Sequence, residues 1–280
     1  MAESDRTPHF MTVGESRSDL PLFVFLSGMD GTGTLLRVQT TSLQQHFNIR
    51  CLVIPPDDLT SWEELTEQVL ELILKEVHTL GRRSVYLCGE SFGGCLAINL
   101  ALRVNGVLSG SLDHAPEQLP QLFSRIILVN PASSLGRRPW IYWGSHLTRL
   151  LPESLYQLSC VTLLPFLVSL NRISESDRWA LLQAMQSVTP ATSIWRLSLL
   201  QDFQVTDEQL RHITQPVLLV ASQCDRLLPS DNEAKLLAQS IPDTKIHFLP
   251  DSGHACLLER EVNLYNILEQ SGFVEQFSRV

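Results

Sequence analysis

The sequence of 280 residues is 44% hydrophobic and 18% charged, with a formal net charge of −9 at pH 7. This length and composition allow a large buried core and argue against disorder over most of the chain. The acidic balance disfavours nucleic acid as the main partner, and no stretch reaches the about 18 apolar residues of a membrane span.

The first 130 residues predict a polar tail followed by alternating strands and helices. Residues 1–18 lack the apolar centre of a secretory signal, so we expect a flexible N-terminal tail. Continuously apolar runs predict buried strands at residues 20–26, 49–54, 85–88 and 125–129. Helical patterns lie between them, at residues 35–46 and 62–80. This alternation predicts an α/β fold, with a mainly parallel sheet covered by helices on both faces.

The most informative stretch is Gly89-Glu-Ser-Phe-Gly93, which lies between the third predicted strand and an apolar helical run at residues 95–103. A strand, Gly-x-Ser-x-Gly and a helix form the nucleophile-elbow arrangement, in which glycines let the strand and helix backbones approach each other. Ser91 is therefore the candidate nucleophile, and the alternative is a serine with only a structural role in a turn. Glu90 is expected to pack behind the serine.

A second glycine-rich loop, residues 27–33, follows the first predicted strand. The loop lacks the Gly-Lys-Ser/Thr ending of a phosphate-binding loop. In enzymes with a nucleophile elbow, this loop supplies one oxyanion donor and the residue after the nucleophile supplies the other. The candidate donors are the backbone N–H groups of Met29 and Phe92. Asp30 and Thr32 either contact substrate or only hold the turn.

The alternation stops at residues 132–212, where the sequence predicts only helices, at residues 153–159, 163–170, 174–187 and 192–200. This Leu-rich section contains four of the five tryptophans, namely Trp140, Trp143, Trp179 and Trp195. An all-helical insertion between two strands predicts a cap over the strand ends that forms an apolar substrate pocket. Alternatively, each tryptophan belongs to the core of the cap itself.

The sheet resumes in the last 70 residues, where two chemically informative residues follow predicted strands. Strands are expected at residues 216–221 and 245–249, and helices at residues 233–241 and 257–270. Asp225 follows the first of these strands and His254 the second. Ligands of open α/β sheets bind beyond the carboxyl ends of the strands, so we expect both residues near Ser91. His254 would accept the serine proton, and Asp225 would orient the imidazole. Asp251 is the rival acid, although a turn role suits it better.

Three further segments carry a closer resemblance: Phe-Leu-Ser-Gly-Met-Asp-Gly-Thr-Gly at residues 25–33, Asp-Arg-Leu-Leu-Pro-Ser at 225–230, and Gly-His-Ala-Cys-Leu-Leu-Glu at 253–259. With the elbow, they resemble the α/β-hydrolase superfamily, and in particular the hydrolase part of the esterase/lipase/thioesterase family that includes plant phytyl ester synthases. The resemblance covers most of residues 20–275. It implies Ser91, Asp225 and His254 as catalytic residues and long-chain acyl esters or thioesters as substrates, with phytol or a related alcohol as an acceptor. The plant members continue into an acyltransferase-like domain, whereas this sequence ends at Val280, which favours hydrolysis.

We therefore expect one α/β-hydrolase domain with a core of residues 19–131 and 213–280 and a helical cap of residues 132–212. The expected activity is serine hydrolysis of hydrophobic acyl esters or thioesters through an acyl-enzyme. The alternatives are an acyltransferase that passes the acyl group to an alcohol, and a non-catalytic lipid-binding module. The six cysteines show no ligand spacing, so we expect no metal or organic cofactor. Buried thiols favour a cytoplasmic protein, with at most transient contact with a membrane surface.

Overall fold

The computed structural model describes residues 7–81, 84–109, 119–137 and 153–274, with the backbone alone for residues 153–157. Its centre is a seven-stranded sheet in the order β1-β3-β2-β4-β5-β6-β7. Every neighbouring pair is parallel except β1 and β3, which are antiparallel. The strands are β1 (His9–Val13), β2 (Leu22–Leu26), β3 (Asn48–Val53), β4 (Val85–Glu90), β5 (Phe123–Val129), β6 (Val217–Ser222) and β7 (Thr244–Leu249). The six strands expected from the sequence and their parallel arrangement are confirmed.

Strand β1 corrects the prediction of a flexible tail over residues 1–18. His9 pairs with Val53 and Val13 with Ile49, so the segment forms an antiparallel edge of the sheet. The side chain of Phe10 packs against the core on one face of the sheet, and Met11 packs on the other. Pairing with β3 stabilises this short strand, and its polar flanks hide the alternating pattern in the sequence. Residues 1–6 lie outside the described part of the chain.

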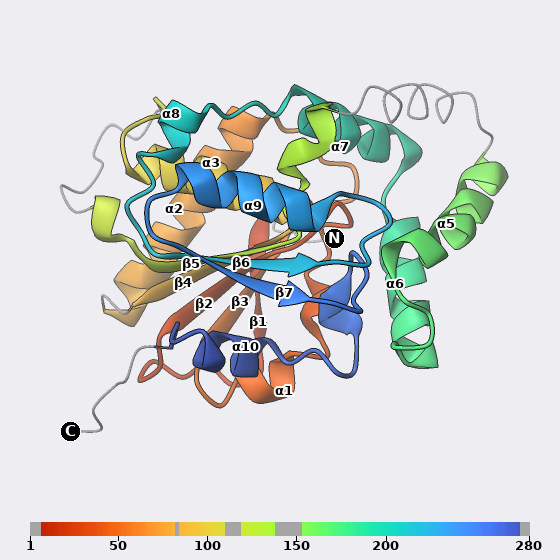
Figure 1. The fold of residues 1–280 in the computed structure, drawn as a ribbon, viewed down its shortest axis with the longest axis horizontal. Helices are drawn as coiled ribbons and strands as arrows, with labels where there is room; N and C mark the ends of the chain where they lie inside the picture. Colours follow the sequence, from red (N-terminus) through yellow and green to blue (C-terminus); the bar gives the residue numbers. More distant parts are fainter. Residues whose placement is uncertain (1–6, 82–83, 110–118, 138–152, 275–280) are drawn as a thin grey trace.

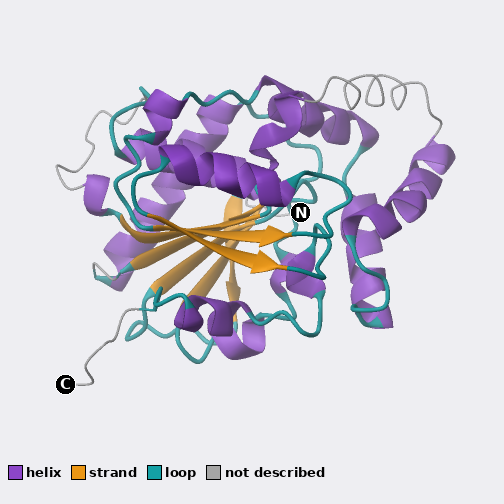
Figure 2. Cartoon of the chain, in the orientation of Figure 1, coloured by secondary structure: helices purple, strands orange, loops and turns teal. Residues whose placement is uncertain are grey.

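Helices cover both faces of the sheet, as Figures 1 and 2 show. One buried cluster lies between the sheet and helices α2 (Trp62–Leu80), α3 (Phe92–Val104), α7 (Pro190–Asp202), α8 (Asp207–Leu210) and α9 (Ser230–Ser240). The other lies between the sheet and α1 (Thr40–Leu43) and α10 (Leu264–Gln270). Burial on both faces explains why the central strands are continuously apolar rather than alternating.

Two predicted helices are shorter than expected, and the buried side chain of Gln39, which lies between the two parts of the first, accounts for the break in the second. Residues 35–46 form a 3₁₀ turn (Thr34–Leu36) and α1, while residues 257–270 form a 3₁₀ turn (Cys256–Leu258) and α10. The Gln39 amide donates to the carbonyls of Leu257 and Val262 at 2.7 and 2.9 Å and accepts from the Leu264 N–H at 2.8 Å. Gln39 therefore satisfies backbone groups that an unbroken closing helix would have paired internally.

The section between β5 and β6 is helical, as the sequence predicts. It contains a 3₁₀ segment (Ala132–Arg137) and α5 (Glu153–Leu167), α6 (Glu175–Ser187), α7 and α8. Helices α5 and α6 lie beyond the carboxyl ends of β6 and β7, where the arrowheads point in Figure 1. Residues 153–159 and 163–170, predicted as two helices, belong largely to the single helix α5. No described helix has both the length and the hydropathy needed to span a membrane.

The tryptophans of this insertion have different surroundings. Trp179 is 59% exposed and is not a core residue. Trp195 packs against the main core and donates its indole N–H to the Thr60 carbonyl at 3.1 Å. Trp140 and Trp143 lie outside the described residues. The apolar substrate pocket expected in the cap stays a prediction, because residues 138–152 are not described.

Candidate active site

Ser91 stands on a sharply strained turn between β4 and α3. Its φ of 53° and ψ of −111° lie in a region that L residues with a side chain rarely adopt. Close backbone packing forces this conformation. A Cβ on Gly93 would lie 2.1 Å from the Leu26 carbonyl oxygen, and a Cβ on Gly89 would lie 2.2 Å from the Gly93 carbonyl oxygen. The two glycines of the motif are therefore required where α3 crosses over β2 and β4.

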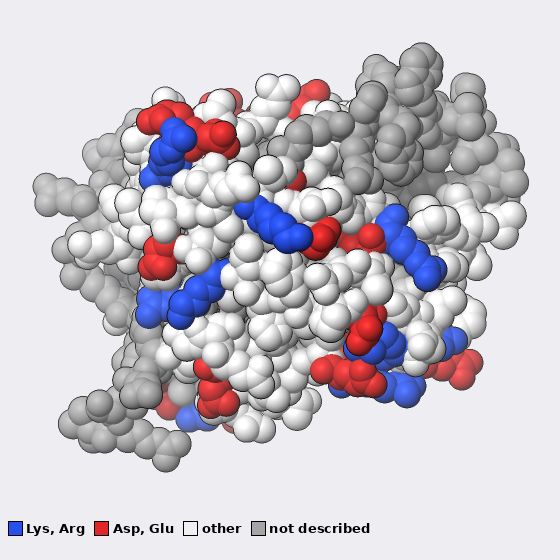
Figure 3. Space-filling model, viewed as in Figure 1, with Lys and Arg blue, Asp and Glu red and all other residues white. Residues whose placement is uncertain are grey.

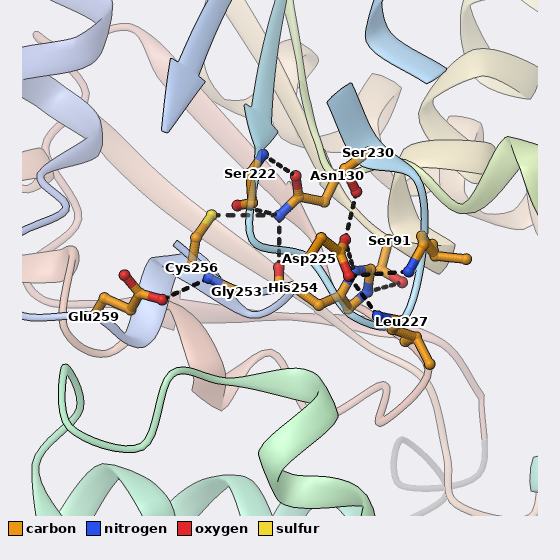
Figure 4. Close-up of polar contacts among 11 residues, drawn as sticks. Ser91, Asn130, Ser222, Asp225, Leu227, Ser230, Gly253, His254, Cys256 and Glu259 are labelled. Atoms are coloured by element: carbon orange, nitrogen blue, oxygen red, sulfur yellow. Dashed lines mark hydrogen bonds and ion pairs between the residues drawn. The ribbon is translucent and has the colours of Figure 1, made fainter. Parts of the chain in front are cut away.

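The three residues singled out in the sequence form one hydrogen-bonded chain (Figure 4). The distance from Ser91 Oγ to His254 Nε2 is 2.9 Å, and that from His254 Nδ1 to Asp225 Oδ2 is 2.7 Å. Ser91 follows β4, Asp225 follows β6 and His254 follows β7, all at the carboxyl edge of the sheet. Asp251, the rival acid, is exposed on the same loop as His254. In this geometry, the serine hydroxyl can pass its proton directly to the imidazole.

Asp225 is held as an ionised acceptor. Burial by itself raises its pKa, but the charge and hydrogen bond of His254, with hydrogen bonds from Ser230 and the Leu228 N–H, lower the pKa below its usual value. Oδ1 accepts from the N–H groups of Leu227 and Leu228 at 2.8 and 2.9 Å. The Ser230 hydroxyl and the His254 ring donate to Oδ2. An ionised Asp225 requires the proton on Nδ1 of His254, which leaves Nε2 free to accept from Ser91.

His254 is only 4% exposed, and two carboxyl groups, those of Asp225 and Glu90, influence its pKa. Burial lowers its pKa, but the charge and hydrogen bond of Asp225 and the charge of Glu90 raise the pKa above its usual value. The backbone of His254 is also fixed, because the buried Asn130 amide donates to its carbonyl at 2.7 Å. Asn130 Oδ1 accepts from the Ser222 N–H at 2.8 Å, which ties the histidine to the end of β6.

A second buried side chain holds the histidine loop from the other side. Glu259 is 0% exposed, and its Oε1 accepts from the Gly253 N–H at 2.8 Å. Arg172, in the segment between α5 and α6, donates to Glu259 Oε2 at 2.7 Å. The Ala255 N–H in turn donates to the Leu167 carbonyl at the end of α5, at 2.8 Å. The insertion therefore contacts the loop that positions His254.

Glu90, the last residue of β4, packs behind Ser91 as expected and is 5% exposed. Burial raises its pKa to about 8, with His254 lowering it and Asp30 raising it. Burial therefore favours the protonated form of Glu90, and it is the ionised form that raises the pKa of His254.

The glycine-rich loop of residues 27–33 lies directly beside the serine. A Cβ on Gly28 would be 3.8 Å from the Ser91 Cβ, in ordinary van der Waals contact. The Asp30 carboxylate accepts from the Thr32 N–H at 2.9 Å and also from its hydroxyl, so these two side chains hold the turn. Phe92 is the first residue of α3, where an N–H has no acceptor within the helix. The structure thus places both candidate oxyanion donors on segments that adjoin Ser91.

Sequence reasoning missed several residues that fix this site. Asn130 was not singled out from the sequence, although a buried polar residue directly after a core strand is a usable signal. Ser230 and Glu259 occur within the resemblance segments without an assigned role. Arg172 gave no signal in the sequence, because its partner Glu259 is 87 positions away.

The fold and the site define an alpha/beta hydrolase. The model of the alpha/beta hydrolase family matches residues 23–264, and the chain belongs to that family. Phytyl ester synthase 1, chloroplastic, from Arabidopsis thaliana is 31% identical over 282 residues, which cover 92% of this chain and 38% of that protein. Pimeloyl-(acyl-carrier protein) methyl ester esterase from Nitrosomonas europaea is 31% identical over 232 residues, which cover 78% of this chain and 82% of that protein.

A solved structure shows the same fold at low sequence identity. A hydrolase from Oleispira antarctica superposes with a TM-score of 0.71 at 15% identity, covering 95% of this chain and 94% of that chain. The chain spans only 38% and 39% of the lengths of the two plant phytyl ester synthases it matches. These similarities show an enzyme family with esterase-like members.

The buried Glu90 predicts a pH-dependent stability difference for Glu90→Gln. The usual pKa of 4.5 is raised to about 8 in the folded chain, so between these values folding keeps a proton that the unfolded chain has lost. The stabilising contribution of this proton is complete below pH 4.5 and is lost as the pH rises through 8. The glutamine variant should therefore gain stability over the wild type across this interval, by a few kcal/mol at most.

Urea unfolding of both proteins at several pH values measures this difference. Glu71→Gln, an exposed position on α2, is the matched control and should follow the wild type at every pH. Parallel stability curves for Glu90→Gln and the wild type would contradict the account of Glu90.

Proposed function

We propose that the protein is a serine hydrolase that cleaves carboxylic esters or thioesters of hydrophobic acyl groups through an acyl-enzyme. The observation that carries this proposal is the hydrogen-bonded chain from Ser91 through His254 to Asp225, with distances of 2.9 and 2.7 Å. The strained turn supports it, since backbone strain of this kind concentrates at functional sites. No metal or organic cofactor is part of the proposal.

The proposed reaction has two balanced halves. Ser91 Oγ attacks the carbonyl carbon while its proton moves to His254 Nε2, and the N–H groups of Met29 and Phe92 stabilise the oxyanion. The tetrahedral intermediate collapses as His254 gives that proton to the leaving alcohol or thiol, which leaves an acyl group on Ser91. Water then attacks the acyl-enzyme, His254 takes and returns a proton in the same way, and the free acid departs.

The acyl acceptor is the main alternative within this proposal. The name of the Arabidopsis relative refers to the synthesis of a phytyl ester, whereas that of the Nitrosomonas relative refers to an esterase. An alcohol that reaches the acyl-enzyme before water would make the protein an acyltransferase. Both reactions use the same first half, so only the products distinguish them. A non-catalytic lipid-binding module is the alternative from another class, and it requires no turnover at all.

Substitutions in the hydrogen-bonded chain should remove turnover of a long-chain p-nitrophenyl ester. Ser91→Ala should reduce kcat by about four to six orders of magnitude, and Asp225→Asn by about four, because the asparagine favours the wrong imidazole tautomer. Asp251→Asn, the exposed rival on the histidine loop, is the matched control and should change kcat by less than about threefold.

Chromatography of the products with a long-chain alcohol present then separates hydrolysis from transfer. Free acid as the main product supports the hydrolase, and a new ester supports the acyltransferase. Absence of any turnover by folded wild-type protein would exclude both and favour the lipid-binding module.

The partner surface we propose is a lipid aggregate that contacts helices α5 and α6. Large apolar side chains between 36% and 59% exposed gather there, and we call them the α5–α6 apolar face: Leu158, Val161, Leu163, Phe166, Leu170 and Trp179. The sequence has no charged residue between Glu153 and Arg172. Elsewhere, both charge signs are interspersed on the face seen in Figure 3, with no basic patch for anionic headgroups. This supports apolar contact with an uncharged or zwitterionic lipid surface.

Charge placed on the α5–α6 apolar face should weaken binding to phosphatidylcholine vesicles. Leu158→Glu and Phe166→Glu should each reduce vesicle binding in a flotation assay by about tenfold or more. Each replaces an apolar side chain that would enter the lipid with a charged one. Leu236→Glu, at a 47% exposed position on α9, is the matched control and should leave binding unchanged. Equal binding by all three variants would contradict this surface.

The cellular location we propose is the cytoplasm. All six cysteines are free thiols, and five of them are buried. Free thiols in such number suit a reducing compartment.

A further inference from the structure

The buried side chain of Arg196 on helix α7 binds the loop of residues 27–33, which carries the candidate oxyanion donor Met29. Arg196 lies on α7 and is 2% exposed. Its Nη1 donates to the Met29 carbonyl at 2.6 Å, and its Nη2 donates to the Pro55 carbonyl at 2.9 Å. Burying a guanidinium costs free energy, so its place between two backbone carbonyls indicates a specific task.

The loop is built to receive this guanidinium. Gly31 has a φ of +67°, and a Cβ there would lie 2.8 Å from Arg196 Nη1 and 2.9 Å from the Ile54 carbonyl oxygen. The Gly31 N–H donates to the Gly28 carbonyl at 3.0 Å, which closes a turn with Met29 at its second position. That bond leaves the Met29 carbonyl outside the turn, where Arg196 binds it. A larger residue at position 31 would displace the arginine.

Holding the Met29 carbonyl also orients the Met29 N–H. The N–H and the carbonyl flank the same Cα, so fixing the carbonyl within a closed turn restricts both backbone dihedrals of this residue. Gly28, whose peptide carries the Met29 N–H, lies beside the Ser91 side chain. An oxyanion donor must be held in place before the charge develops, because a donor that moves during the reaction stabilises it less.

We propose that Arg196 is a positioning residue for the oxyanion site, through which helix α7 of the cap fixes the turn that carries the Met29 N–H. This inference rests on the proposed function, because it assigns Arg196 a part in the same reaction. The planar fork suits two carbonyls on separate segments, whereas a lysine ammonium is a point charge on a flexible stem. Arg196 touches neither substrate nor Ser91 in this role, and its effect passes through Met29.

Helix α7 has other anchors, which makes the role of Arg196 separable. The Trp62 indole N–H donates to the Leu199 carbonyl at 2.7 Å, and the Trp195 indole N–H donates to the Thr60 carbonyl at 3.1 Å. These bonds join α7 to the first residue of α2 and to the β3–α2 connection, and neither involves Met29. A substitution of Trp195 therefore loosens the same helix while leaving the bond between Arg196 and Met29 in place.

The test compares Arg196→Met and Arg196→Lys with Trp195→Phe, which removes only the indole donor. With a p-nitrophenyl ester, we expect kcat to fall about 10- to 100-fold in Arg196→Met and less in Arg196→Lys, with KM within about threefold of the wild type. The affinity for a trifluoromethyl ketone, which forms an oxyanion on the serine, should fall by the same factor as kcat. The affinity for the product acid should stay unchanged. In Trp195→Phe, both kcat and the affinity for the ketone should stay at the wild-type value.

A merely structural Arg196 gives a different pattern. Equal losses in Arg196→Met and Trp195→Phe, or a kcat loss without a parallel loss of ketone affinity, would overturn the inference and leave the proposed function intact. A wild type that neither turns over ester nor binds the ketone would overturn the proposed function and this inference with it. Thermal melting by circular dichroism shows which variants are folded. If Arg196→Met does not fold, Arg196→Lys, which keeps the charge and a donor, tests the inference instead.

Discussion

The close approach of α3 to strands β2 and β4 is the constraint on which the rest of the structure depends. A hypothetical Cβ on Gly93 would come within 2.1 Å of a β2 carbonyl oxygen, so the helix can lie this close only through glycine. That contact forces Ser91 into its strained turn and raises the side chain above the carboxyl edge of the sheet. The same approach brings the loop after β2 against the serine, and so joins the candidate nucleophile to a candidate oxyanion donor.

The other half of the site depends on buried polar side chains that hold backbone. Asn130 binds the His254 carbonyl, and Glu259 binds the Gly253 N–H beside it. The section between β5 and β6 contacts both loops, through Arg172, which binds Glu259 on the histidine side, and through Arg196 on the Met29 side. It contributes hydrogen bonds that set the geometry of the site, which is why contacts far from Ser91 in the sequence matter to the proposed chemistry.

The sequence predicts the sheet and the three central residues because both leave local signals. Continuous apolar runs indicate the buried strands, and the glycines around Ser91 indicate a close backbone approach. Strand β1 escaped prediction because its pairing with β3, not its own pattern, makes it a strand. The break in the predicted helix at residues 257–270 escaped because Gln39, which binds its backbone groups, is more than 200 positions away. Arg196 acts on backbone carbonyls more than 100 positions away, which leave no mark in the sequence. Long-range polar contacts of this kind become visible only in the folded chain.

Covalent labelling with a fluorophosphonate, followed by mass spectrometric location of the adduct, tests the central claim most directly. The reagent reacts with a serine only when a neighbouring base activates it, so it reports the chain from Ser91 to Asp225 without any assumption about substrate. The account predicts one adduct, on Ser91, that is absent in a folded Ser91→Ala variant. Absence of any adduct in folded wild-type protein with lipid present, or an adduct on a different serine, would contradict it.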